Sequence, residues 1–206
     1  MNKISILVAD DPKIVRMGLK SLFAAARDLA VVGEADDGDA AVRQALALRP
    51  DVIVMDLMMP EKDGVAATAE IHARLPEARI VVLTSYSTSD TIAAALAAGA
   101  AGAVMKSADD GTLLTAVRAV AAGETFISPE VKGLLAADPP APTLSPRQLE
   151  VLAMLVKGFN NAEIAGMLGI SRTVAKEHVE NLLAKLGATN RTEAAAIALR
   201  KQLVKV

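Results

Sequence analysis

Five polar residues end or directly follow predicted buried strands: Asp10, Asp11, Asp56, Thr84 and Lys106. An unpaired carboxylate is costly to bury, and the carboxyl ends of the strands in a parallel sheet meet along one side. Carboxylates gathered there repel one another unless a cation lies among them, and oxygen-only ligands with open positions suit Mg²⁺. One carboxylate could then attack a phosphoryl group whose charge the metal, the Lys106 ammonium and the Thr84 hydroxyl neutralise. Taken singly, each residue is more often a cap or turn residue, but the five together favour a phosphoryl-group site.

The elements that must position these residues alternate along the first 122 residues. Short apolar runs predict buried strands, and apolar residues at helical spacing predict amphipathic helices between them. The predicted strands are Ile4–Ala9, Ala30–Glu34, Val52–Asp56, Arg79–Thr84 and Gly102–Met105. The predicted helices are Lys13–Phe23, Ala40–Leu48, Val65–Leu75, Ser89–Ala98 and Thr112–Ala122. This order predicts an α/β fold, a (βα)5 doubly wound parallel sheet with helices on both faces.

Composition limits the class of protein. The chain of 206 residues contains no Cys, which excludes disulfides and thiolate metal sites and fits a reducing compartment. Acidic residues come too early for an N-terminal signal peptide. The longest apolar stretch, Ala93–Met105, is interrupted by glycines and is too short to span a bilayer. We therefore expect a soluble, cytoplasmic protein with no membrane partner.

The charge is divided along the chain. Residues 143–206 carry nine Lys or Arg and five Asp or Glu, a net charge of +4, whereas the preceding 142 residues carry 13 and 19, a net charge of −6. Such a division suggests two functions, with nucleic acid as a candidate partner of the basic part.

The basic part is predicted to be a separate domain of four helices. Prolines make residues 124–142 a predicted linker, with one short helix at Pro129–Ala136. Beyond it, two helical patterns are joined by the glycine-containing turn "LGIS" at 168–171, which is typical of a helix-turn-helix. The alternative is a plain helical bundle that never contacts DNA. The predicted domains are therefore 1–123 and an all-α helix-turn-helix domain at 143–206.

The first domain resembles the receiver domain of two-component response regulators. The resemblance is carried by "DD" at 10–11, "MDLMMPEKDG" at 55–64, "LTS" at 83–85 and Lys106. It implies that Asp56 accepts a phosphoryl group from a histidine kinase. It also implies a Mg²⁺ site formed by Asp11, Asp56 and the Met58 carbonyl, with Asp10 more remote.

The resemblance further implies that Thr84 and Lys106 contact the phosphoryl oxygens and transmit the signal. The chain departs from the receiver pattern at Ala103, where an aromatic switch residue is usual, and at Pro12. Met58 and Tyr86 are expected to flank the phosphoryl group.

The second domain resembles the LuxR-type output domain, and the whole chain resembles the NarL/FixJ class of response regulators. The matching motifs are "LSPRQLEVL", "NNAEIAGMLGIS", "KEHV" and "KLGATNRTEA". The resemblance implies binding of double-stranded DNA, normally as a homodimer, with RNA polymerase as a candidate partner. The expected DNA-binding residues are Arg172, Thr173, Lys176, Glu177 and Glu180.

The helix over 191–201 is a candidate for the contact between the two copies of a dimer. Two departures from the family pattern fall where DNA contacts are expected. Val174 replaces a usual threonine and Ala162 replaces a frequent lysine, so two phosphate contacts are expected to be missing. His178 fits the "HV" position of the family, and neither it nor His72 has a ligand cluster around it.

Two other functions compete with a phosphorylation-controlled transcriptional regulator. The first is an enzyme, an aspartyl-phosphate phosphatase of the dehalogenase type; such enzymes place an acidic residue two positions after the nucleophile, where this chain has Met58. The second is a regulator that works without phosphate, which Ala103 keeps open. We expect a regulator and not an enzyme.

Overall fold

The computed structural model of the chain describes residues 3–85, 88–201 and 203–204. It divides into two compact units, residues 1–140 and 141–206. Each unit has its own hydrophobic core. No helix in the described ranges has the length and apolar character needed to cross a membrane.

The first unit is built on a parallel sheet of six strands in the order β2-β1-β3-β4-β5-β6. The strands are β1 (Ile4–Ala9), β2 (Leu29–Ala35), β3 (Val52–Asp56), β4 (Ile80–Thr84), β5 (Gly102–Met105) and β6 (Phe126–Ile127). The predicted fold class is confirmed, with β6 as an unpredicted addition. Strands β3 and β4 are buried along their whole length, which fits sequences that are apolar up to the last residue of each strand.

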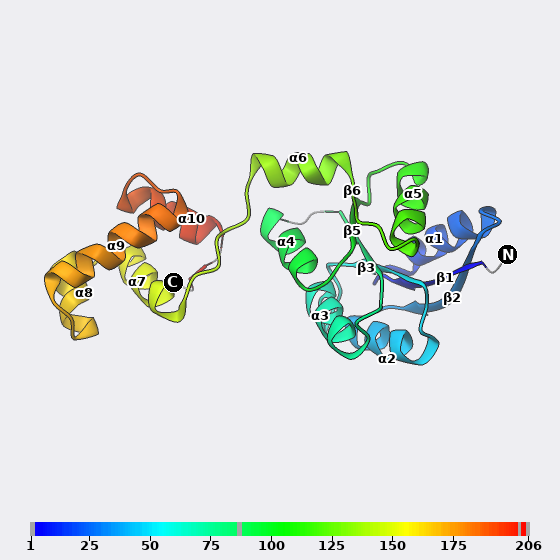
Figure 1. Ribbon diagram of the computed structural model, residues 1–206, viewed down its shortest axis with the longest axis horizontal. Coiled ribbons are helices and arrows are strands. Elements are labelled where there is room, and N and C mark those ends of the chain that lie inside the picture. Colours follow the sequence, from blue (N-terminus) through cyan, green and yellow to red (C-terminus); the bar gives the residue numbers. More distant parts are fainter. Residues whose placement is uncertain (1–2, 86–87, 202, 205–206) are drawn as a thin grey trace. The chain divides into compact units, whose positions relative to one another are not determined.

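Helices cover both faces of this sheet (Figure 1). Helices α1 (Lys13–Ala25) and α5 (Asp110–Ala121) pack on one face. Helices α2 (Gly38–Leu48), α3 (Gly64–Arg74), α4 (Ser89–Ala97) and α6 (Pro129–Ala137) pack on the other. Alternate residues of a strand serve the two cores: Leu7 and Ile53 face the α2–α4 side, while Ile6 and Val54 face α1 and α5.

The segment predicted as a linker belongs largely to the first unit, and this corrects the expected boundary at residue 123. Strand β6 pairs with β5 through Ala103 and Ile127, and the Ser128 N–H donates to the Ala103 carbonyl at 2.9 Å. Helix α6 then buries Val131 completely in the core. The chain stays attached to the sheet because these residues bury apolar surface and complete backbone hydrogen bonds, and the proline-rich stretch begins only after α6.

The second unit contains the four predicted helices: α7 (Pro146–Val156), α8 (Asn161–Leu168), α9 (Arg172–Leu186) and α10 (Arg191–Arg200). Ser145 and Asn160 begin α7 and α8 with capping boxes, and Ser171 caps α9 through the Val174 N–H. Gly169 ends α8 at a φ of 65°, a left-handed conformation that glycine adopts without strain. The turn between α8 and α9 is therefore set by Gly169 and Ser171, as in a helix-turn-helix.

The core of this unit is formed by one side of each helix. Along α9, the buried residues are Ala175, Val179, Leu182 and Leu186, the stripe predicted from helical spacing. They pack with Leu152, Ile164 and Ala198 from the other helices. The opposite side of α9 is left for solvent or a partner.

Candidate functional site

Two buried carboxylates share one ammonium group at the carboxyl end of the sheet. Strand register places the ends of β1, β3, β4 and β5 side by side. Lys106 Nζ lies 2.6 Å from Asp10 Oδ2 and 2.9 Å from Asp56 Oδ2. Asp10 is 1% exposed and Asp56 is 4% exposed. The structure therefore brings together three of the predicted site residues, whose sequence numbers span almost a hundred positions.

Burial and pairing act on these groups in opposite directions. Burial raises the pKa of the Asp10 carboxyl, although the neighbouring Lys106 opposes the shift. Burial also disfavours the charged form of Lys106, but hydrogen bonds and attraction from Asp10 and Asp56 outweigh it and raise the pKa of the ammonium. Lys106 is therefore held as a cation against the two carboxyl groups.

The loop after β3 holds the Asp56 carboxylate from the other side. The Met58 N–H donates to Asp56 Oδ1 at 3.2 Å, and the Gly64 N–H donates to the Leu57 carbonyl at 3.1 Å. A Cβ on Gly64 would lie 2.0 Å from the Asp56 carbonyl oxygen, so only glycine permits this close return of the chain. The Met58 side chain is 65% exposed beside this loop.

Thr84 and Ala103 lie on β4 and β5, the two strands that follow β3 in the sheet. Thr84 is buried at the end of β4, and its carbonyl accepts a hydrogen bond from the Lys106 N–H at 2.7 Å. Ala103 is fully buried on β5 and lies against β6. Tyr86, the other residue expected to flank a phosphoryl group, lies outside the described residues.

The third predicted carboxylate stands apart. The Asp11 residue is exposed, and the described part of the chain contains no group of three acidic, His or Cys side chains placed to hold a metal ion. Lys106 occupies the position between Asp10 and Asp56 where a cluster of three would need a cation. The donor set still suits a hard cation, because Asp10 Oδ1 is buried and no described donor reaches it.

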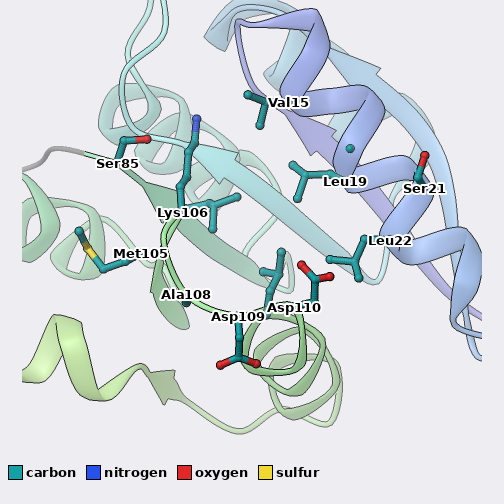
Figure 2. A pocket seen from close by; sticks show the side chains of 13 residues that line it. Val15, Leu19, Ser21, Leu22, Ser85, Met105, Lys106, Ala108, Asp109 and Asp110 are labelled. Atoms are coloured by element: carbon teal, nitrogen blue, oxygen red, sulfur yellow. The ribbon is translucent and has the colours of Figure 1, made fainter.

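Lys106 also lines a pocket of about 600 Å³ on the α1 and α5 side of the sheet (Figure 2). Its lining is mostly apolar, with Val15, Leu19 and Leu22 from α1. Asp109 and Asp110 lie at the start of α5. The same lysine thus borders both the acidic pair and a surface pocket.

Arg16 is a site residue that the sequence analysis missed. Its Nη1 donates to the main-chain carbonyls of Asp10, at 2.7 Å, and Asp11, at 2.6 Å. Its Nε lies 3.5 Å from Glu34 Oε2, and its side chain is only 13% exposed. The available signal was an arginine one helical turn after Pro12, on the side of α1 that packs against the sheet.

In the second unit, the five residues expected to contact DNA lie together on α9, and all are exposed. These residues are Arg172, Thr173, Lys176, Glu177 and Glu180. Lys176 Nζ lies 3.5 Å from Glu180 Oε1, a contact one helical turn apart. No described side chain forms an ion pair or hydrogen bond with Glu177, which leaves its carboxylate open to an external donor.

The two departures from the family pattern in the second unit, Val174 and Ala162, are both exposed. Val174 is 38% exposed near the start of α9, and Ala162 is exposed near the start of α8. His178 is half-buried on α9, whereas His72 packs against Gly99 in the first unit. Neither histidine belongs to a metal-binding group among the residues described.

Comparison with known families assigns each unit. Residues 6–118 match the model of the response regulator receiver domain. Residues 142–198 match the model of bacterial regulatory proteins of the luxR family.

The chain is also similar to known proteins along nearly its whole length. The chain is 37% identical over 209 residues to the transcriptional regulatory protein LiaR of Bacillus subtilis, with 98% of this chain and 99% of LiaR covered. It is also similar to a structure of two RcsB dimers bound to two parallel DNAs, at 28% identity and a TM-score of 0.68, covering 97% and 99% of the two chains. RcsB from Salmonella enterica serovar Typhimurium, bound to the promoter P1flhDC in the presence of the phosphomimetic BeF3⁻, gives the same identity and TM-score, covering 95% and 98%.

Proposed function

Because the chain belongs to the transcriptional response regulators that join a receiver domain to a LuxR-type DNA-binding domain, we propose that phosphorylation of Asp56 controls its binding to promoters. The observation that carries this proposal is the arrangement of Asp56, Asp10 and Lys106 at the carboxyl end of the sheet. One carboxylate is held by a main-chain N–H and a lysine, while a second acid and a buried threonine lie nearby.

In this proposal the phosphoryl donor is the phosphohistidine of a histidine kinase. An oxygen of Asp56 attacks phosphorus, and the phosphorus–nitrogen bond of the donor breaks with its electron pair remaining on the imidazole. Lys106, already a cation at 2.9 Å, neutralises charge on the transferred oxygens. The Thr84 hydroxyl is the second group proposed to contact those oxygens.

A Mg²⁺ ion fits this site as part of the same proposal. Asp10, Asp11, Asp56 and the Met58 carbonyl are the proposed ligands, and all supply oxygen, the atom that Mg²⁺ prefers. When bound, the ion neutralises negative charge that develops on the phosphoryl oxygens. The unpartnered, buried Asp10 Oδ1 supports a cation at this place.

The second unit is proposed to bind double-stranded DNA as a homodimer, through α9 in the major groove. Arg172, Thr173 and Lys176 would contact phosphates and base edges, with Glu177 and Glu180 on the same surface. The DNA-bound RcsB dimers support this proposal. RNA polymerase is a further proposed partner. Because the kinase and the DNA would both be reached there, the proposed location of the protein is the cytoplasm.

Labelling at Asp56 tests the proposal. With Mg²⁺ and acetyl phosphate, the full-length protein should gain one alkali-labile phosphoryl group, counted by intact-protein mass spectrometry, and Asp56→Asn should gain none. Binding to a promoter fragment, measured at fixed salt, should become tighter after labelling. Label retained by Asp56→Asn at the wild-type level would refute the assignment of Asp56. Labelling without any change in promoter binding would favour a regulator that works without phosphate.

A further inference from the structure

We propose that Arg16 is a positioning residue for the acidic site, because its guanidinium fixes the peptide groups that carry Asp10 and Asp11. This inference rests on the proposed phosphorylation and Mg²⁺ binding at Asp56. It concerns a residue that contacts neither Asp56 nor the phosphoryl group.

The hydrogen bonds of Arg16 are unusual in their direction. Successive carbonyls of a strand point to opposite sides, yet a single nitrogen, Arg16 Nη1, reaches the carbonyls of Asp10 and Asp11 at 2.7 and 2.6 Å. Both oxygens can face one donor only if the chain turns between these two residues. Arg16 therefore holds the turn that ends β1 and separates a buried Asp10 from an exposed Asp11.

Arg16 is itself held in place by a second contact. Its Nε lies 3.5 Å from Glu34 Oε2, and Lys20 pairs with the other oxygen of Glu34. Glu34 is on β2, next to β1 in the sheet, where it pairs with Val8. The guanidinium therefore lies between β2 and the turn at Asp10 and Asp11, and the Arg16 side chain is only 13% exposed.

The carbonyls of Asp10 and Asp11 need such a partner because β1 has ended. The Asp10 N–H still donates to Ala35 at 3.0 Å, but Arg16 supplies donors where no further strand residue does. Charge-assisted bonds of this kind are stronger than neutral ones. Partners that orient ligands in this way typically change metal affinity by about 10- to 100-fold when they are removed.

The simpler role is a tether that only joins α1 to β2, and it makes a different prediction. A tether would affect the stability of the fold and leave the acidic loop unchanged. Lys20→Gln is the matched control, because it removes the other cation paired with Glu34 without touching the Asp10 and Asp11 carbonyls.

The experiment compares full-length wild type, Arg16→Gln, Arg16→Lys and Lys20→Gln. Calorimetric titration with Mg²⁺ alone gives the affinity, thermal unfolding gives the Tm, and labelling with acetyl phosphate at saturating Mg²⁺ gives the capacity of Asp56. We expect Arg16→Gln to weaken Mg²⁺ binding by about tenfold or more, with Lys20→Gln within about twofold of wild type. At saturating Mg²⁺, Arg16→Gln should still accept one phosphoryl group, which separates this inference from the identity of the acceptor.

Unchanged Mg²⁺ affinity in Arg16→Gln, with a loss of Tm equal to that of Lys20→Gln, would overturn the inference and leave a tether. If Arg16→Gln shows no cooperative unfolding, Arg16→Lys decides between the two roles. It keeps the positive charge near Glu34 but has a shorter side chain. Wild-type Mg²⁺ affinity in Arg16→Lys would then overturn the inference, and an intermediate affinity would support it. If the wild type binds Mg²⁺ but accepts no phosphoryl group, Asp56 is not the phosphoryl acceptor. The Mg²⁺ affinities of the variants would still decide the role of Arg16.

Discussion

Both oxygens of the Asp56 carboxylate are engaged, one by Lys106 at 2.9 Å and the other by the Met58 N–H at 3.2 Å. A phosphoryl group on Asp56 must replace one of these contacts. Lys106 can remain with Asp10 at 2.6 Å while it meets the new oxygens, because an ammonium has three donors. The chemistry of this residue is therefore governed by groups that border it, above all Lys106 and the residue at position 58.

We expect Met58 to lengthen the life of the acyl phosphate. Its side chain is 65% exposed beside Asp56 and offers no hydrogen bond to an attacking water. Met58→Asn adds a polar group, whose hydrogen bond of about 1 kcal/mol corresponds to hydrolysis about fivefold faster. Loss of label is followed after the phosphodonor is removed.

The control is Met58→Leu, which keeps an apolar side chain of similar size. The lifetime of its acyl phosphate should lie within about twofold of the wild-type lifetime. Because the position is exposed, neither substitution should change the Tm appreciably. Equal decay in Met58→Asn and Met58→Leu would mean that residue 58 does not control access of water.

At the scale of the element, helix α9 separates packing from recognition. Its buried stripe, from Ala175 to Leu186, fixes the helix on α7, α8 and α10. The exposed carboxylates of Glu177 and Glu180 would be repelled by DNA phosphates, so their presence on this side of the helix calls for an explanation. Glu180 has one in Lys176, 3.5 Å away, whereas Glu177 has no described intrachain partner.

We therefore predict that Glu177 reads a base pair. A glutamate can accept a hydrogen bond from the cytosine amino group in the major groove. Glu177→Ala should relax the preference at one G·C pair in each half-site and shift specificity by about 1–3 kcal/mol. Binding of the full-length protein to a library of single-base operator variants, at one salt concentration, measures this shift.

Glu180→Ala is the matched control from the next turn of the same helix. Its loss removes an exposed pair with Lys176 worth about a few tenths of a kcal/mol and should leave the order of preferred sequences unchanged. Uniformly tighter binding of Glu177→Ala to every sequence would show that Glu177 only repels the DNA backbone.

Elements with a strong local pattern were predicted well. Strands β1, β3 and β5 lie at their predicted bounds because each is a short apolar run that a charged residue ends. Strand β6 has two residues and no periodicity, so only its pairing with β5 defines it. The strand-end residues were visible for the same reason as the strands. The contacts of Arg16 were not, because they depend on the direction of carbonyl groups at a turn.

At the scale of the whole molecule, the division of charge matches the division into units. The charges were counted for residues 1–142 and 143–206, whereas the units are residues 1–140 and 141–206. The two residues that differ, Ala141 and Pro142, are uncharged, so the net charges of −6 and +4 are also those of the two units. A net positive charge favours attraction to DNA phosphates, and a net negative charge opposes it. The acidic unit nevertheless continues past the predicted boundary, through β6 and α6.

The extension through β6 and α6 has a consequence for how the receiver can be isolated. A fragment that ends at residue 123 would make β5 an edge strand, because the Ala101 and Ala103 carbonyls would lose the Phe126 and Ser128 N–H groups that donate to them. It would also uncover the apolar surface beneath Val131. Such an edge is a template for pairing with another copy. We expect the 1–123 fragment to aggregate and to lose at least about 1.5–3 kcal/mol of unfolding free energy from Val131 alone, while the 1–140 fragment stays monomeric. Light scattering and urea unfolding measure both, and equal behaviour of the two fragments would show that β6 and α6 do not protect the sheet from self-association.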